Sequence, residues 1–276
     1  MGKDTVEGLW KATLEMELVA EKKLQTMLKP YEPITEMLYE CGVEVATLKS
    51  KRAANNDDDL IVAALFLKRC LNDFRTIWRL LNLGYTSQAG SIAAAMFEHA
   101  LMISAVIERP DRAEKVINTD NLKSPWSAQQ LCNIEVEAME HEAKITGSVM
   151  TKEEKDKEFN TLYSLYKWLC KIKHPTMMYV QHDAGSTSLQ ENYVIMAAPD
   201  IGILNLPIKF NILSIAIGRL HTAVRRFALG MGLDHEDKRV AEWLGRFNNI
   251  IPASVAAFKS LENIEVPVQI KVNKGI

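Results

Sequence analysis

The sequence predicts an all-α protein, a bundle of about eight to nine helices, from three observations. Apolar residues recur at spacings of three and four along most of the chain, which is the period of a helix face. Prolines, glycines and capping residues divide this pattern into segments of ordinary helix length. Hydrophobic residues make up 47% of the 276 residues, enough for a sizeable core. We therefore expect residues 1–276 to form a single domain without a flexible linker.

The N-terminal part, residues 1–56, is expected to be a helical pair that packs on a core formed by residues 57–261. Residues 4–28 place leucines among charged residues, and residues 33–53 continue the helical pattern. Prolines separate the two segments, because proline interrupts the hydrogen bonding of a helix interior.

The next two helices have the clearest patterns. The acidic run at residues 55–59 supplies a cap and an acidic first turn for a helix that ends at Gly84. Apolar side chains share one face of it, namely Leu67, Leu71, Phe74, Trp78, Leu81 and Tyr85. The segment 87–108 follows after a very short link, so we expect an antiparallel neighbour. Glu98 at its middle would cost about 2.5–3.5 kcal/mol in a bilayer, which favours a buried core helix over a membrane span.

Helical segments continue to the C-terminal region. A short helix starts at Pro110, and residues 127–147 form a helix rich in glutamate. Thr151 and Glu154 form a capping box for a helix that runs to His174, where the following proline ends it. Two further helices are expected at residues 207–229 and 236–261, the second with a break at Pro252.

The remaining segments lack helical periodicity. Residues 183–192 have loop composition, and residues 193–198 read as a short strand. In the extended tail, residues 262–276, apolar residues alternate strictly over residues 266–272. We expect a minor two-stranded β patch that pairs residues 193–198 with residues 266–272.

The charge balance and the cysteines argue against several classes of protein. A formal charge of −2 gives no general attraction to nucleic acid or to an anionic membrane. The basic stretch Arg219, Arg225 and Arg226 is interpreted as a partly exposed basic face. The four cysteines form no CxxC pair, which argues against a zinc framework or a disulfide scaffold. The N-terminus lacks the pattern of a signal peptide, so we expect a cytoplasmic protein with no membrane partner.

Glu98 is the first candidate site residue. A carboxylate within an apolar helix must find a cation or a hydrogen-bond donor, because burial of an unpaired charge is costly. Arg75 and Arg79 on the preceding helix are the candidate partners and candidate ligand-binding residues. Two interpretations stay open at this point: a structural ion pair, or a carboxylate that lines an internal polar pocket.

A second group of candidates lies near the end of the helix that the capping box opens. Tyr166, Cys170 and His174 are spaced four apart and therefore share one stripe. A cysteine beside a histidine can form a thiolate nucleophile, although buried cysteines are common in cores. The helix C-terminus favours a charged His174, and His182 follows closely enough to fold back towards it.

Metal and cofactor motifs are absent from the sequence. Glu137 and His141 are four residues apart, whereas a carboxylate-bridged di-iron bundle requires Glu-x-x-His. No HExxH, GxGxxG or phosphate-binding loop occurs. We therefore expect no metal and no cofactor, and we interpret the glutamate-rich run at residues 135–142 as a solvated helix face.

Four motifs occur in the order LLNLGYTSQA, FEHAL, ERPDRA and YKWLCKIKHPT within residues 60–185. In this order they resemble a bacterial family known as domain of unknown function number fifty-six seventy-seven. The resemblance implies an all-α fold, a bacterial or phage origin and a site built from Glu98 and His174. Family members commonly carry arginine where this chain has Ala94, so that arginine's role is vacant or is filled from elsewhere.

Three functions follow as hypotheses. The first is a soluble binding protein whose internal polar site of Glu98, His174 and His182 takes a small polar ligand or a protein partner. The second is a hydrolase acting on a phosphate-containing substrate, with Glu98 as base, His174 as acid and an arginine that stabilises negative charge. The third is a structural scaffold or homo-oligomer without an active site.

Overall fold

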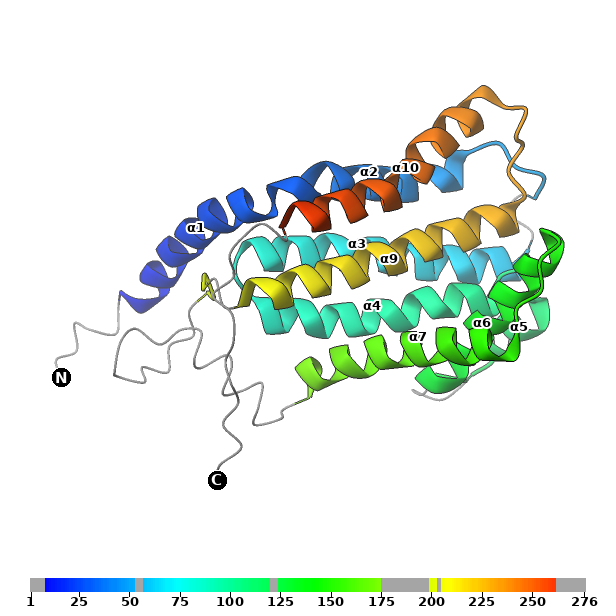
Figure 1. Ribbon diagram of the computed structural model, residues 1–276, viewed down its shortest axis with the longest axis horizontal. Coiled ribbons are helices and arrows are strands. Elements are labelled where there is room, and N and C mark those ends of the chain that lie inside the picture. Colours follow the sequence, from blue (N-terminus) through cyan, green and yellow to red (C-terminus); the bar gives the residue numbers. More distant parts are fainter. Residues whose placement is uncertain (1–7, 53–56, 120–123, 175–198, 203–204, 262–276) are drawn as a thin grey trace.

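The computed structural model describes residues 8–52, 57–119, 124–174, 199–202 and 205–261, and this part of the chain is built from helices (Figure 1). The α-helices are α1 (Leu9–Leu28), α2 (Glu32–Glu44), α3 (Asp58–Asn82), α4 (Thr86–Val106), α5 (Pro110–Ile117), α6 (Ala128–Ile145), α7 (Lys152–Lys173), α9 (Leu206–Met231) and α10 (Lys238–Leu261). The predicted all-α class is confirmed. The predicted β patch, residues 193–198 with 266–272, lies outside the described residues.

The helices pack in layers around α4. Helices α3, α4 and α9 contact one another extensively and form the centre of the bundle. Helices α6 and α7 cover α4 on one side, while α2 and α10 cover α3 and α9 on the other (Figure 1). Helix α1 extends from this body along α3 (Figure 1).

Helix α4 is the core helix that its apolar sequence predicts. Most of its residues are buried, and alanines and glycines let neighbouring helices approach closely. A Cβ atom on Gly90 would lie 2.7 Å from the side chain of Ile172, so α4 and α7 are in close contact there. Within the described residues α4 alone is long and apolar enough to span a membrane, and 72% of its apolar window is buried inside the protein.

Helix α2 ends earlier than the sequence predicts. The helix stops at Glu44, a 3₁₀ turn follows, and Leu48 is extended, so the expected helix over residues 33–53 is wrong in its last part. The extended residues pair with the turn between α9 and α10: the Lys51 amide donates to the carbonyl of Gly232 at 2.9 Å. This long-range pairing outweighs the helical propensity of the segment.

The predicted helix ends at residues 84, 151 and 174 are confirmed. Gly84 has a φ of +84°, and a Cβ atom there would lie 2.8 Å from the carbonyl oxygen of Asp200. Thr151 and Glu154 form a capping box in which each backbone amide donates to the other side chain. Helix α7 stops at Lys173, and His174 already has extended backbone angles.

The break predicted at Pro252 is wrong, because α10 continues through it to Leu261. A proline inside a helix removes one hydrogen bond and leaves the carbonyl four residues earlier without its usual donor. That carbonyl belongs to Asn248, an exposed residue, so water can reach this position. The structure therefore tolerates the proline at the surface of the bundle.

Two of the surface interpretations are wrong for one residue each, Glu135 and Arg226. Glu135 is fully buried, and its carboxylate lies 3.4 Å from the guanidinium of Arg226, which is itself 7% exposed. Glu142 contacts both Arg225 and Arg226. Glu135 and Glu142 of the glutamate-rich run therefore form ion pairs with arginines of α9. Glu137 and Arg225 stay exposed, so the rest of each segment keeps a solvated face.

Candidate functional site

Glu98 contacts α7 and has a tyrosine as its partner. The Tyr166 hydroxyl donates a hydrogen bond of 2.6 Å to the Glu98 carboxylate, and both residues are half-buried. Burial raises the pKa of Tyr166, and its contacts with Cys170 and Glu98 add to the rise. The sequence argument that Glu98 must find a cation or a donor is confirmed, and the donor is a neutral phenol.

The predicted ion pair between Glu98 and an arginine is not formed in the described part of the chain. Arg79 contacts Glu21 on α1, and the guanidinium of Arg75 lies 5.8 Å from the ring centre of Tyr39 on α2. Both arginines lie on the face of α3 that the N-terminal helices cover. The expectation was wrong because the sequence places α3 beside α4 without fixing which face of α3 meets it.

Glu98 and His174 do not converge. His174 is the exposed C-cap of α7, and it follows Tyr166 by about two helical turns, or about 12 Å along the axis. Helices α4 and α7 run antiparallel, so His174 lies near the start of α4 and Glu98 lies near its middle. Cys170 is one turn from His174 and contacts Tyr166. His182 lies outside the described residues.

The other candidates near Glu98 have structural partners. The Nδ1 atom of His99 lies 2.9 Å from the carboxylate of Asp73 on α3, which satisfies this histidine as the sequence suggests. In the part of the chain that the structure describes, no three His, Cys, Asp or Glu side chains come together as a metal site.

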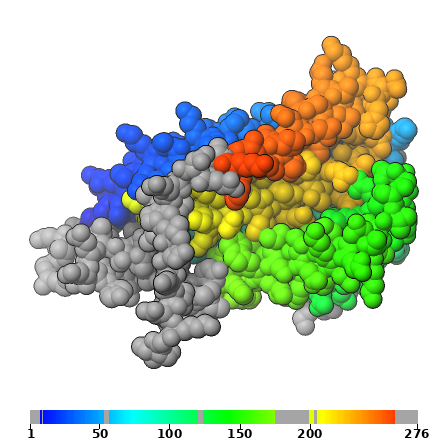
Figure 2. All heavy atoms as spheres, in the orientation of Figure 1, coloured from blue at the N-terminus to red at the C-terminus, as the bar shows by residue number. Residues whose placement is uncertain are grey.

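A large groove lies on another face of the bundle, between α7, α9 and α10. Figure 2 shows α9 as a yellow band between the green of α7 and the orange to red of α10. The groove has a volume of about 800 Å³. The side chains that line it are mostly apolar or small, namely Ser164, Leu165, Trp168, Asn211, Ser214, Ile215, Ile217, Gly218, Arg219, Ile251, Ser254, Val255, Phe258 and Lys259.

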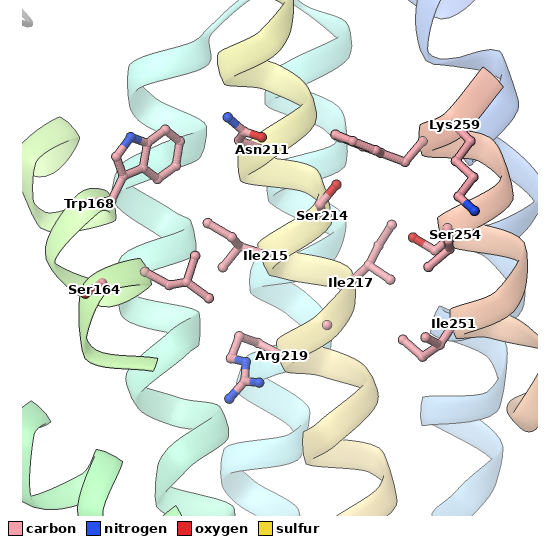
Figure 3. Close-up of a pocket in the computed structure, with 14 residues that line it drawn as sticks. Ser164, Trp168, Asn211, Ser214, Ile215, Ile217, Arg219, Ile251, Ser254 and Lys259 are labelled. Carbon is pink, nitrogen blue, oxygen red and sulfur yellow. The ribbon is translucent and has the colours of Figure 1, made fainter. Parts of the chain in front are cut away.

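Helix α9 forms the floor of this groove, and α7 and α10 form its walls (Figure 3). At Gly218 the floor is open, because a Cβ atom there would meet no other atom within 4 Å. On the α10 wall, Val255 and Phe258 are 49% and 42% exposed, so these apolar side chains face the groove and are not packed into the core. Arg219 lies at the end of the groove away from Trp168 (Figure 3).

A smaller cavity of about 310 Å³ lies where α9 turns into α10. His221 lines it, and its ring stacks on Phe247 with ring centres 4.2 Å apart. Burial lowers the pKa of His221 to about 4, so the ring is neutral at neutral pH. Arg225 and Lys51 stand at the rim of this cavity.

The groove was not predictable from the sequence patterns. Ile251, Val255 and Phe258 recur at helical spacing, which is equally typical of a core face. Ser214 and Gly218 form a small-residue stripe that could have indicated a close helix neighbour or an open floor. Only the three-dimensional arrangement shows that no described helix covers this stripe.

The chain matches no family model, no curated protein and no solved structure. The resemblance to the family of unknown function, and the role that it implies for Glu98 and His174, therefore stay predictions.

Proposed function

We propose that this chain is a binding protein whose ligand is a small molecule with a long apolar body, held in the groove between α7, α9 and α10. The observation that carries the proposal is the groove itself: about 800 Å³, walled by apolar side chains and open at Gly218. Small-molecule sites typically have volumes of about 300–1,000 Å³ and a mostly apolar lining with a few polar groups. Ser164, Ser214 and Asn211 would supply such polar groups.

The geometry favours binding over the hydrolase alternative. That alternative needs Glu98 and His174 to act on one substrate, and the described residues keep them about two helical turns apart. Glu98 also already accepts a hydrogen bond from Tyr166. The ligand is more apolar than the small polar molecule that the sequence suggests, since the larger described groove is lined mainly by apolar atoms.

The length of the groove supports a single extended molecule as the occupant. The floor from Asn211 to Arg219 spans about two helical turns, or about 12 Å. An aliphatic chain of moderate length fits this distance. A helix from a protein partner is the rival occupant, and it would also need the open floor at Gly218.

Filling the groove tests this proposal. Gly218→Leu should abolish binding of ω-bromoundecanol, because the new side chain starts from an open position on the floor and fills the groove. Binding is measured as quenching of Trp168 fluorescence by the bromine atom, with Trp168→Phe to identify the signal. Replacement of a helical glycine should also raise the free energy of unfolding, by up to about 1 kcal/mol.

Gly245→Leu is the matched control. Gly245 lies on α10, away from the groove, and a Cβ atom there also meets nothing within 4 Å. This variant should be stabilised in the same way and should bind the probe like the original chain. If the alcohol fails to quench Trp168 in the original chain, or binds Gly218→Leu equally well, the groove is not a ligand site of this kind.

A further inference from the structure

The end of the groove away from Trp168 carries an arginine with an unusual environment. Arg219 is half-buried, and burial lowers its pKa. No hydrogen bond or ion pair joins its guanidinium to another residue among those that the structure describes. Glu135 and Glu158 act on it only through space. A guanidinium in such a place has a strong requirement for an anion or another acceptor.

Arg226, two turns further along α9, is an arginine whose charge is paired with carboxylates inside the protein. Its guanidinium lies 3.4 Å from Glu135 and 3.1 Å from Glu142. Arg219 has no comparable carboxylate, and no acidic residue belongs to the described lining of the groove. The chain thus neutralises one arginine internally and leaves the other facing the groove.

The ring of Phe97 holds Arg219 in place without satisfying its N–H groups. The guanidinium carbon lies 5.2 Å from the centre of this ring, which is fully buried. Stacking on an aromatic ring covers one face of the guanidinium. The five N–H donors point outward in the guanidinium plane, so they stay available for a planar acceptor. Figure 3 shows the side chain directed from α9 towards α7, inside the groove.

We infer that the ligand of the groove is a long-chain carboxylate, with its carboxylate on Arg219 and its apolar chain running along α9 towards Trp168. This inference rests on the proposed function, and it adds the chemical class and the orientation of the ligand. A carboxylate matches a guanidinium with two parallel hydrogen bonds, and a single guanidinium matches a single negative charge. Lys259 stands at the other end, where its side chain is exposed to solvent.

Three probes that share one chain and differ in head group test the inference. ω-Bromoundecanoate, ω-bromoundecanol and ω-bromoundecylamine are titrated into the original chain, with Trp168 quenching as the readout. We expect the carboxylate to bind about tenfold to a hundredfold more tightly than the alcohol, which is the range for hydrogen bonds to charged groups. The amine should bind more weakly than the alcohol.

Variants of Arg219 and Lys259 identify which of these two cations binds the carboxylate. Arg219→Gln should remove the preference for the carboxylate and should change the affinity for the alcohol much less. Arg219→Lys should keep part of the preference, because it keeps the charge and loses the bidentate geometry. Lys259→Gln should have little effect. Since alcohol binding reports an intact groove, a loss caused by misfolding would be recognised.

The position of the bromine tests the orientation. The ω-bromine lies beside Trp168 if the carboxylate is on Arg219, so 2-bromoundecanoate should bind equally well and quench less. If all three head groups bind alike, or if the preference survives in Arg219→Gln, the carboxylate inference is overturned and the groove proposal stands. If dodecyl phosphate displaces the probe better than dodecanoate, the head group is a phosphate and the carboxylate assignment is wrong. If no probe binds, the proposed function itself fails.

Discussion

At the residue scale, His221 shows how packing sets a charge state. Its ring lies almost parallel to that of Phe247, at 2°, and Phe247 stacks in turn on Trp243 with ring centres 4.7 Å apart. Desolvation in this stack lowers the pKa of His221 from 6.5 to about 4, and a hydrogen bond with the backbone of Phe247 opposes part of that change.

The stack predicts a stability that depends on pH between about 4 and 6.5. In this window the unfolded chain binds a proton at His221 and the folded chain does not, so unfolding takes up a proton. The contribution of the neutral His221 to stability is complete above pH 6.5 and is lost as the pH falls towards 4. Urea unfolding midpoints across this range should fall more steeply for the original chain than for His221→Phe.

His235→Asn is the control for this measurement, because His235 lines the same cavity and is exposed. Its midpoints should follow those of the original chain. If the urea midpoint falls equally steeply with pH in the original chain and in His221→Phe, His221 is not the titrating group.

The candidate site was partly predictable at this scale. The sequence requires a partner for Glu98, since the surrounding helix is apolar. It places Tyr166 and Cys170 on one stripe of α7, and they do contact each other, with Tyr166 also bonded to Glu98. The identity of the partner was not predictable, because it depends on the rotation of α3 and α7 about their axes. The position of Arg219 at the end of a groove was not predictable for the same reason.

At the element scale, α10 carries an internal proline and also one wall of the groove. Three groove residues lie close to this proline: Ile251 directly precedes it, and Val255 and Phe258 follow it. Prolines are the usual cause of bends in helices. The direction of the groove wall therefore depends on the geometry at Pro252.

Pro252→Ala should raise the free energy of unfolding by about 1–3 kcal/mol, because alanine restores a helical hydrogen bond and removes a steric clash. Urea denaturation measures the change. Pro110→Ala is the control: Pro110 lies in the first turn of α5, where proline is favourable, so it should give no gain. A loss of stability in Pro252→Ala would mean that the surrounding packing requires the proline.

The elements themselves were largely predictable from the sequence. Capping boxes, glycines and prolines act locally, so the ends at Gly84, Thr151 and His174 follow from a few neighbouring residues. The end of α2 at Glu44 and the continuation of α10 through Pro252 were not predictable. Residues 48–52 pair with a turn about 180 positions later in the chain, and Pro252 is tolerated through its exposure.

At the scale of the whole molecule, Asp200 joins distant segments. Its carboxylate lies 2.7 Å from the Nζ atom of Lys209 and 2.6 Å from the side-chain amide of Asn205. It also accepts a hydrogen bond from Thr86 at the start of α4, and its backbone amide donates to the carbonyl of Gly84. The beginning of α9 is thereby fixed to the turn between α3 and α4.

Asp200→Ala should lower the free energy of unfolding by about 3–5 kcal/mol, the usual cost of removing one partner of a buried ion pair. Thermal or urea unfolding measures the loss. Glu242→Ala is the control, because Glu242 is 63% exposed in its pair with Lys238, and such surface pairs contribute only about 0–1 kcal/mol. Similar losses in the two variants would show that the Asp200 cluster does not hold the fold together.

The groove is a property of the whole molecule, and this explains why sequence patterns missed it. Its lining comes from three helices, and each helix carries an ordinary amphipathic pattern. Periodicity identifies which residues share a face, but it does not identify which faces remain uncovered after the bundle has assembled.

The pairing of α2 with α10 has a consequence for how the protein is made. The indole of Trp243 donates to the carbonyl of Cys41, so α2 receives one of its covering layers from the last described helix. A ribosome delivers the chain from its N-terminus, and α2 is therefore made long before α10 exists. Until α10 has been made, the apolar face of α2 that carries Leu38 and Cys41 lacks this cover. This face of the nascent chain is thus exposed to aggregation until α10 has left the ribosome.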